Sequence, residues 1–175
     1  MLSKEFSIMI RNVRIEDSDA IAAIYNHYVV NSTVTFEVEA ITGTEIAKRI
    51  QANLDADLPW LIAEAEAEAE AEGNVIGYCY ATPWKAREAY QHSVEISVYL
   101  DADSHTKGIG TQLYAALFTQ LKTQNVHAVM AGIALPNEAS IALHEKHNMQ
   151  KVAHFKQVGK KFGQWIDVAY WQVIL

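Results

Sequence analysis

Apolar positions follow helical spacing early in the chain and change to strand-like runs towards its middle. The apolar segment at 8–13 predicts a short strand. Residues 16–32 then repeat apolar side chains three and four positions apart, which predicts a helix with Asp17 or Ser18 as its N-cap. A second helix is expected from Thr42, because the "TGTE" that begins there is a capping box.

Three strands are predicted between Trp60 and Leu100, where Val, Ile and Tyr predominate and turn residues bound each run. They cover 60–65, 74–81 and 92–100. The low-complexity segment 63–73, AEAEAEAEAEG, joins the first two. Its strict alternation suggests a strand, but Ala and Glu are poor strand formers and alanine buries little surface. We therefore expect a stretched, acidic, solvent-exposed hairpin arm, which is more typical of a tolerated insertion than of a functional segment.

The C-terminal half predicts two further helices and three strands. Apolar residues four positions apart give 109–121 the clearest helical pattern in the chain. A shorter helix, capped by Asn137, is expected at 136–148. The strands are expected at 126–134, 151–159 and 165–175. The order of elements is then β-αα-βββ-α-β-α-ββ without a linker, so we predict one α+β domain over 1–175, with helices flanking a mixed sheet.

Composition narrows the class of protein. A chain of 175 residues, half of them apolar and a fifth charged, suits one globular domain with a sizeable core. The net charge of −7 argues against general nucleic-acid binding. No apolar stretch reaches the roughly 20 residues that span a bilayer, and the opening residues lack a signal-peptide pattern. The single cysteine, Cys79, is expected to be a buried structural thiol. We therefore expect a reduced cytoplasmic protein without a membrane or nucleic-acid partner.

A glycine-containing loop precedes the strongest predicted helix, in the stretch SHTKGIGTQL at 104–113. It fits neither the nucleotide-hydrolase P-loop, whose lysine follows the glycines, nor the dinucleotide fingerprint, which needs a third glycine and a place after the first strand. The backbone amides of 106–111 could instead hold a pyrophosphate at the helix N-terminus, with Lys107 adding positive charge. Gly108 and Gly110 would allow close approach. From this loop alone, an ordinary strand-to-helix turn is an equally good interpretation.

The segments around this loop resemble the GNAT N-acetyltransferases, whose acyl-CoA loop has the pattern Gln/Arg-x-x-Gly-x-Gly/Ala. The resemblance runs from about Ile10 over nearly the whole chain and is closest to the phosphinothricin and methionine sulfoximine acetyltransferases. The stretches that carry it are "TFE", "LPW", "GYCYATPWKAREAY", "VEISVYL", "GIALPNEASIALHEKHNM" and "FGQWIDVAYWQ". It implies the GNAT fold, acetyl-CoA as co-substrate and a homodimer. His105 departs from the pattern, since the family has Gln or Arg there.

The resemblance also implies how acetyl-CoA is held. The backbone of the strand that ends at Leu100 would bind the pantetheine arm, and one of its amides would polarise the thioester carbonyl. The implied cofactor-binding residues are Val98, Tyr99, Leu100, His105, Thr106, Lys107, Gly108, Ile109, Gly110, Thr111, Asn137 and Lys146. The neutral side chain of His105 supplies fewer donors than arginine and no fixed charge, so its contribution is expected to depend on pH.

Two side chains are candidates for acid–base chemistry. Glu95 alternates with the core-facing residues Val94 and Ile96 and so points to the opposite face of its strand. The residues alone favour a solvated carboxylate or an ion pair there, whereas the resemblance implies a general base whose pKa is raised by burial. The residues alone likewise favour a surface position for His144. The resemblance implies that it protonates the departing thiolate or positions the substrate.

The loop WKAREAY at 84–90 combines two cations with two aromatic rings. Its composition alone is typical of a solvated loop, but the resemblance implies that it binds the carboxylate and oxidised side chain of an amino-acid analogue. The implied acceptor-binding residues are Phe36, Trp84, Lys85, Ala86, Arg87, Tyr90, Glu95, Ile96 and Ser97. Glu37 stands where some relatives of the phosphinothricin type have a basic residue.

The expected function is therefore acetyl transfer from acetyl-CoA to the α-amine of methionine sulfoximine, methionine sulfone or phosphinothricin. The alternatives are a protein N-terminal or lysine acetyltransferase of the same fold and a non-catalytic CoA- or amino-acid-binding module. No metal is expected, because the seven histidines show no ligand spacing.

Overall fold

The computed structural model describes residues 8–65 and 73–175 and contains one seven-stranded sheet. The strands are β1 (Ile8–Asn12), β2 (Trp60–Ala65), β3 (Asn74–Pro83), β4 (Ser93–Leu100), β5 (Ala128–Ala134), β6 (Gln150–Lys161) and β7 (Gln164–Ile174). The helices are α1 (Ser18–Asn31), α2 (Gly43–Asp55), α3 (Ile109–Leu121) and α4 (Glu138–Lys146), with short 3₁₀ turns at Ile15–Asp17 and Glu88–Tyr90. The predicted order of elements and the mixed α+β architecture are confirmed.

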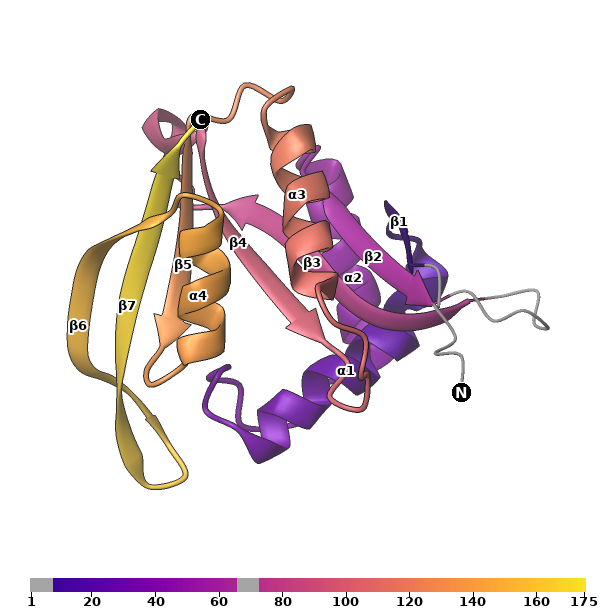
Figure 1. The fold of residues 1–175 in the computed structure, drawn as a ribbon, viewed down its shortest axis with the longest axis horizontal. Helices are drawn as coiled ribbons and strands as arrows, with labels where there is room; N and C mark the ends of the chain where they lie inside the picture. Colours follow the sequence, from indigo (N-terminus) through magenta and orange to yellow (C-terminus); the bar gives the residue numbers. More distant parts are fainter. Residues whose placement is uncertain (1–7, 66–72) are drawn as a thin grey trace.

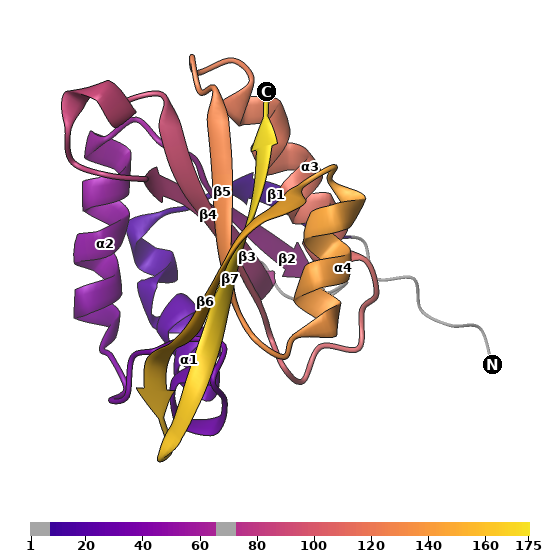
Figure 2. The same cartoon turned by 90° about the vertical axis from the view of Figure 1, so that its left-hand side faces the viewer.

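The sheet separates two helical layers. Figures 1 and 2 show α1 and α2 on one face and α3 and α4 on the other. On the first face, Ile21, Val29 and Ile50 pack against Trp60 and Tyr78 of the sheet. On the second face, the apolar positions of α3 pack against alternate residues of the central strands. The helix contributes Leu113, Leu117 and Leu121, and the strands contribute Leu61, Val94, Ile96 and Val129. The helical and strand periodicities therefore place both cores.

The middle of the sheet opens between β4 and β5. The strand order is β1-β2-β3-β4-β5-β7-β6, and β4–β5 is its parallel pair. This pairing extends only from Ser93, opposite Ala128, to Glu95, opposite Met130. Beyond Glu95 the two strands diverge, as Figure 1 shows, while β5 stays paired with β7 as far as Ala134. The divergence leaves the second half of β4 without β5 as a neighbour, and Glu95 stands where it begins.

Two of the three predicted helix caps make a side-chain cap bond. The Thr42 hydroxyl accepts a hydrogen bond from the amide of Glu45, and the Asn137 side chain accepts one from the amide of Ser140. Asp17 stands at the N-cap of α1, as predicted, but its side chain makes no cap bond to that helix. The Asp17 carboxylate instead accepts from the Arg14 amide at 2.7 Å and pairs with a neighbouring arginine.

The Ala/Glu segment 63–73 differs at its start from the exposed arm that the sequence predicts. Ala63 is fully buried and Glu64 is 8% exposed, because both belong to β2 between β1 and β3. Arg11 of β1 binds the Glu64 carboxylate and also that of Asp17, which satisfies the buried charge. The prediction of solvent exposure is therefore wrong for these residues. The stretch 66–72 lies outside the described residues.

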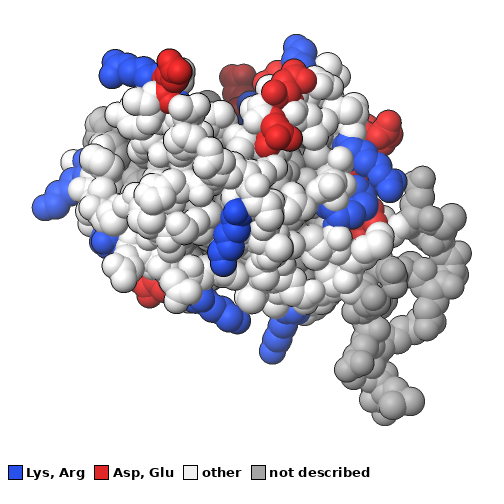
Figure 3. All heavy atoms as spheres, turned by 90° about the horizontal axis from the view of Figure 1, so that it is seen from above, with Lys and Arg blue, Asp and Glu red and all other residues white. Residues whose placement is uncertain are grey.

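Surface charge and helix length bear on the expectation that the protein has no nucleic-acid or membrane partner. On the face shown in Figure 3, basic side chains are scattered among acidic ones and form no single broad patch. In the parts of the chain that the structure describes, no helix is long and apolar enough to cross a membrane. The predicted lack of nucleic-acid and membrane partners stays a prediction.

Candidate active site

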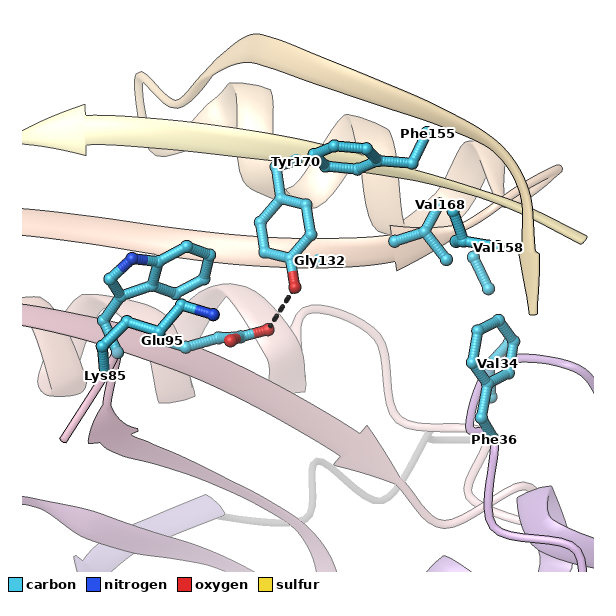
Figure 4. A pocket seen from close by; sticks show the side chains of 11 residues that line it. Val34, Phe36, Lys85, Glu95, Gly132, Phe155, Val158, Val168 and Tyr170 are labelled. Atoms are coloured by element: carbon cyan, nitrogen blue, oxygen red, sulfur yellow. Dashed lines mark hydrogen bonds between the residues drawn. The ribbon is translucent and has the colours of Figure 1, made fainter.

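A cavity of about 540 Å³ lies beside the opening of the sheet. Its walls come from the loop after α1, the residues after β3, and strands β4 to β7. The lining residues are Val34, Phe36, Trp84, Lys85, Glu95, Gly132, Ala134, Phe155, Val158, Val168 and Tyr170. Figure 4 shows the Glu95 carboxylate pointing into this space from β4. Most of the wall is aromatic or aliphatic, so a bound molecule would exchange most of its contact with water for contact with apolar side chains.

The Glu95 carboxylate is held at the floor of the cavity by β5 and β7. The Tyr170 hydroxyl donates a hydrogen bond to Glu95 Oε1 at 3.3 Å, drawn as the dashed line in Figure 4. Gly132 faces Tyr170 across the β5–β7 ladder. A Cβ atom on Gly132 would lie 2.9 Å from Tyr170 Cζ and 3.2 Å from Glu95 Oε1. Because Gly132 has no side chain, the Glu95 carboxylate and the Tyr170 hydroxyl can approach each other at this point.

Burial sets the protonation behaviour of Glu95. Removal from water raises the pKa of its carboxyl group, because it disfavours the charged form. The hydrogen bond from Tyr170, the positive charge of Lys85 and the backbone amide of Gly132 each lower that pKa. The net direction is upward. A carboxylate whose pKa lies nearer to neutral pH is a better proton acceptor than a fully solvated one.

Lys85 carries positive charge to the same end of the cavity. Its Nζ lies 4.9 Å from the centre of the Trp84 ring, and that ring meets Tyr170 edge-on at 5.3 Å. The cation–π contact and the aromatic edge contact restrict where the ammonium can lie. The cavity therefore presents a carboxylate and an ammonium close to one another, with aromatic rings around them.

The structure brings together only part of the predicted acceptor-binding set. Phe36, Trp84, Lys85 and Glu95 line the cavity, whereas five predicted residues do not, namely Ala86, Arg87, Tyr90, Ile96 and Ser97. The first three of these five are exposed in the loop after β3. The Ile96 side chain is 2% exposed and belongs to the core under α3, on the opposite face of β4 from Glu95. Ser97 stands opposite Tyr80 in the β3–β4 ladder.

Seven lining residues were missing from the sequence prediction. They are Val34, Gly132, Ala134, Phe155, Val158, Val168 and Tyr170. Val168 and Tyr170 are two positions apart on β7, so strand periodicity would have placed them on one face. Nothing in the sequence reveals that this face meets Glu95, because that depends on how β5 and β7 pair.

The glycine loop and α4 meet on the other side of the opening. Gly108 has a φ of 83° and precedes the first turn of α3, a backbone conformation that favours glycine. A Cβ on Gly110 would lie 3.1 Å from Leu143 of α4, so the two helices approach closely there. Lys146 Nζ donates a hydrogen bond to Thr111 Oγ1 at 3.4 Å. These contacts bring predicted cofactor-binding residues of α3 and α4 together.

The remaining predicted cofactor-binding residues lie around the same opening. His105 and Lys107 are exposed in the loop, and the loop leads into the N-terminus of α3. Val98 and Leu100 are half-buried on the diverging part of β4. Figure 1 shows the loop, the N-terminus of α4 and the separated ends of β4 and β5 at one end of the sheet. An elongated ligand with an anionic end could thread between the strands and reach the α3 N-terminus.

His144 does not line the cavity that contains Glu95. It is 4% exposed on the face of α4 that packs against α3. Its Nδ1 lies 2.6 Å from the Ser140 carbonyl oxygen and its Nε2 lies 2.9 Å from the Tyr114 hydroxyl. A carbonyl can only accept, so Nδ1 donates and Nε2 accepts from Tyr114. Burial lowers the pKa of the imidazole, which favours this neutral form.

No group of three or more His, Cys, Asp or Glu within 8–65 and 73–175 is arranged to hold a metal ion. The expectation that the reaction needs no metal stays a prediction.

Comparison with known proteins links this geometry to a family. A model of the acetyltransferase (GNAT) domain matches residues 10–170. The chain is 38% identical to a phosphinothricin N-acetyltransferase of Streptomyces viridochromogenes, over 94% of this chain and 86% of the relative. It is 36% identical to an L-methionine sulfoximine/L-methionine sulfone acetyltransferase of Pseudomonas paraeruginosa, over 97% and 95%.

A solved structure resembles the whole fold. It is a GNAT superfamily phosphinothricin acetyltransferase from Sinorhizobium meliloti in complex with acetyl-CoA. The two superpose with a TM-score of 0.88 at 30% identity, over 96% of this chain and 88% of the other.

Proposed function

The chain belongs to the GNAT family of acetyl-CoA-dependent N-acetyltransferases, and from that premise we propose that it acetylates the α-amine of a small amino-acid analogue. L-methionine sulfoximine, L-methionine sulfone and phosphinothricin are the proposed acceptors, since relatives are named for acting on them. The observation that carries the proposal is the Glu95 carboxylate, which faces a cavity of about 540 Å³ at the point where β4 and β5 separate.

Acetyl-CoA would occupy the opening between β4 and β5. The backbone from Val98 to Leu100 has no β5 partner and can offer hydrogen bonds to an extended ligand. The loop from His105 to Gly108 and the first turn of α3, from Ile109 to Thr111, present amides to an anion. Lys146 of α4 adjoins that turn, and Asn137, at the other end of α4, is the N-cap of that helix. When bound, the co-substrate supplies an acetyl thioester.

Glu95 would accept the proton that the acceptor amine must lose. An amine can attack a thioester only through its lone pair, and the ammonium form has none. A buried carboxylate of raised pKa can take that proton directly or through one water. The Tyr170 hydroxyl keeps Oε1 in place while the other oxygen stays available.

His144 is proposed to act on the thiol side of the reaction, as acid or as a positioning group. Its buried, neutral imidazole already engages both ring nitrogens. Nε2 carries no proton in this neutral form, so a direct proton transfer from it would require that nitrogen to be protonated and the Tyr114 contact to break. A contribution through the packing of α4 against α3 requires no such change.

Lys85 would bind the acceptor's α-carboxylate. The amine would then lie towards Glu95 and the side chain would point to the apolar part of the cavity, where Phe36 lies. Among the predicted acceptor-binding residues, we retain Phe36, Trp84, Lys85 and Glu95, since these line the cavity.

A long peptide fits this cavity less well than a single amino acid. Lys161 of β6 donates a hydrogen bond from Nζ to the Thr35 carbonyl at 2.8 Å. A Cβ on Gly159 would overlap the Phe36 ring. The loop after α1 and the strand β6 therefore meet across one side of the cavity, which disfavours the protein-acetyltransferase alternative.

Release of free thiol from acetyl-CoA tests the proposal. The panel would contain methionine sulfone, methionine sulfoximine, phosphinothricin, the ordinary amino acids and a short peptide. We expect release with oxidised amino-acid analogues and little with peptide. Release with peptide alone would contradict the acceptor class, and binding of acetyl-CoA without release for any compound would favour a non-catalytic binding module.

We also propose that the protein is a homodimer, as the resemblance implies. β6 is an edge strand of the sheet, and the β6–β7 hairpin exposes large apolar side chains. This β6–β7 apolar surface consists of Val152, Phe155, Val158, Phe162 and Trp165. Exposed apolar edges favour association, and a second copy would cover this one. The cytoplasmic location stays a prediction.

A further inference from the structure

The charged groups of the acceptor cavity lie at one end of it. Figure 4 shows Lys85 and Glu95 together beside Tyr170, and the aliphatic and aromatic groups Val34, Phe36 and Val158 at the other end. Among the lining residues, Lys85 is the cation and Glu95 is the acid. Under the function proposed above, both charges are used by the α-amino acid part of the acceptor. The side-chain head would then meet the apolar end.

Two cations that contact the loop after α1, Lys161 and Arg49, are engaged by other groups. Lys161 is 3% exposed, and its Nζ is bound to the Thr35 carbonyl. Arg49 pairs with Glu37 at 2.7 Å and also with Glu45. Neither cation lines the cavity. The apolar end, as far as the described residues form it, therefore offers no ammonium or guanidinium to a bound anion.

We infer that the cavity selects acceptors whose side-chain head is electrically neutral, so that methionine sulfone and methionine sulfoximine are preferred to phosphinothricin. Methionine sulfone and phosphinothricin provide a matched pair. Both have a two-carbon spacer and a tetrahedral head that carries two oxygens and a methyl group. The sulfone is neutral, whereas the phosphinate carries a negative charge at neutral pH. Burying that charge against apolar groups without a partner costs far more than burying a neutral polar head.

Steady-state kinetics with this pair test the inference directly. At saturating acetyl-CoA and one pH, we expect kcat/KM for methionine sulfone to exceed that for phosphinothricin by about tenfold or more. An equal or larger value for phosphinothricin would overturn the preference and leave the proposed function intact. Turnover of neither compound would overturn both.

A substitution at the apolar end supplies the second arm. Val34 is half-buried on the loop after α1, outside the β6–β7 apolar surface. Val34→Lys would place an ammonium at the apolar end, and Val34→Met is the control of similar length without charge. We expect the ratio of phosphinothricin to sulfone kcat/KM to rise by about tenfold in Val34→Lys and to stay unchanged in Val34→Met. The same ratio in wild type, Val34→Lys and Val34→Met would overturn the inference.

Discussion

At the scale of single residues, Glu95 is subject to opposing influences. Burial raises the pKa of its carboxyl group, while the Tyr170 hydrogen bond and the Lys85 charge lower it. The balance determines the pH above which the carboxylate can accept a proton. Since a proton acceptor must be ionised to work, kcat/KM is expected to rise with pH through the pKa of Glu95.

Tyr170→Phe should move that rise to higher pH. The substitution removes the hydroxyl that donates to Glu95 Oε1 and keeps the ring that packs on Trp84. Loss of a donor to the charged form raises the pKa of the acid. The pH profile of kcat/KM for methionine sulfone measures the shift. A lower rate in Tyr170→Phe, with the acid limb of the kcat/KM profile (its rise at low pH) at the same pH as in wild type, would contradict this role for Tyr170.

Phe155→Leu is the matched control for Tyr170→Phe. Phe155 lines the same cavity and contacts the Tyr170 ring at 6.1 Å between centroids. Its side chain carries no hydrogen-bonding group, so the variant should change KM for the acceptor and leave the acid limb of the pH profile where it is in wild type.

At the scale of elements, the contact of α3 with α4 is built on neutral histidines. His144 meets Tyr114, and the His147 ring stacks on Phe118 at 5.5 Å. Burial lowers the pKa of both imidazoles below the usual 6.5, with the Lys146 charge adding to the effect at His147. The neutral forms are therefore part of the folded structure.

This packing predicts a loss of stability in mild acid. A histidine whose pKa is lowered by folding binds fewer protons in the folded than in the unfolded state. Its contribution is complete above pH 6.5 and is lost as the pH falls from there through the lowered pKa of the folded state. Urea unfolding at pH 7.5 and 5.5 should show a smaller free energy of unfolding at the lower pH.

His144→Gln tests the source of that loss. The variant removes an ionisable group, so the difference in unfolding free energy between pH 7.5 and 5.5 should be smaller than in wild type. It should also be less stable at pH 7.5, since the contacts with Tyr114 and Ser140 are disturbed. An undiminished pH dependence would show that His144 is not responsible.

The sequence predicted the elements well because each has its own period. The four-residue spacing of leucines in α3 and the alternation around Glu95 in β4 are local signals, and the structure confirms both. The failures arose where a side chain binds a partner outside its own element. Glu64 was expected in solvent but reaches Arg11, and Asp17 was expected to cap a helix but binds Arg11 as well.

At the scale of the whole molecule, the acceptor cavity shows what a sequence leaves open. Glu95, Trp84 and Lys85 were found because the resemblance identified their segments. Gly132 and Tyr170 were missed because their place beside Glu95 depends on the register of β5 with β7. The separation of β4 from β5 likewise has no signal in the residues themselves, because it depends on where the pairing of the two strands stops.

The proposed homodimer gives a prediction at this scale. Trp165 is 60% exposed on the β6–β7 apolar surface, and Val38 is 66% exposed on the loop after α1. Light scattering should give wild type and Val38→Glu about twice the 19.6 kDa chain mass. Trp165→Glu should fall towards one chain mass at the same concentration, because a buried charge disfavours association. A monomeric wild type, or a dimeric Trp165→Glu, would contradict the proposal.

The most direct test of the account compares wild type with Glu95→Gln on methionine sulfone and acetyl-CoA. Mass spectrometry would follow the α-N-acetylated product, and calorimetry would measure acetyl-CoA binding by both proteins. We expect kcat/KM to fall by about 10²–10⁴-fold in Glu95→Gln, as for the loss of a general base, with acetyl-CoA affinity unchanged. Product formation by Glu95→Gln at the wild-type rate would contradict the role of Glu95 on which the proposed function rests.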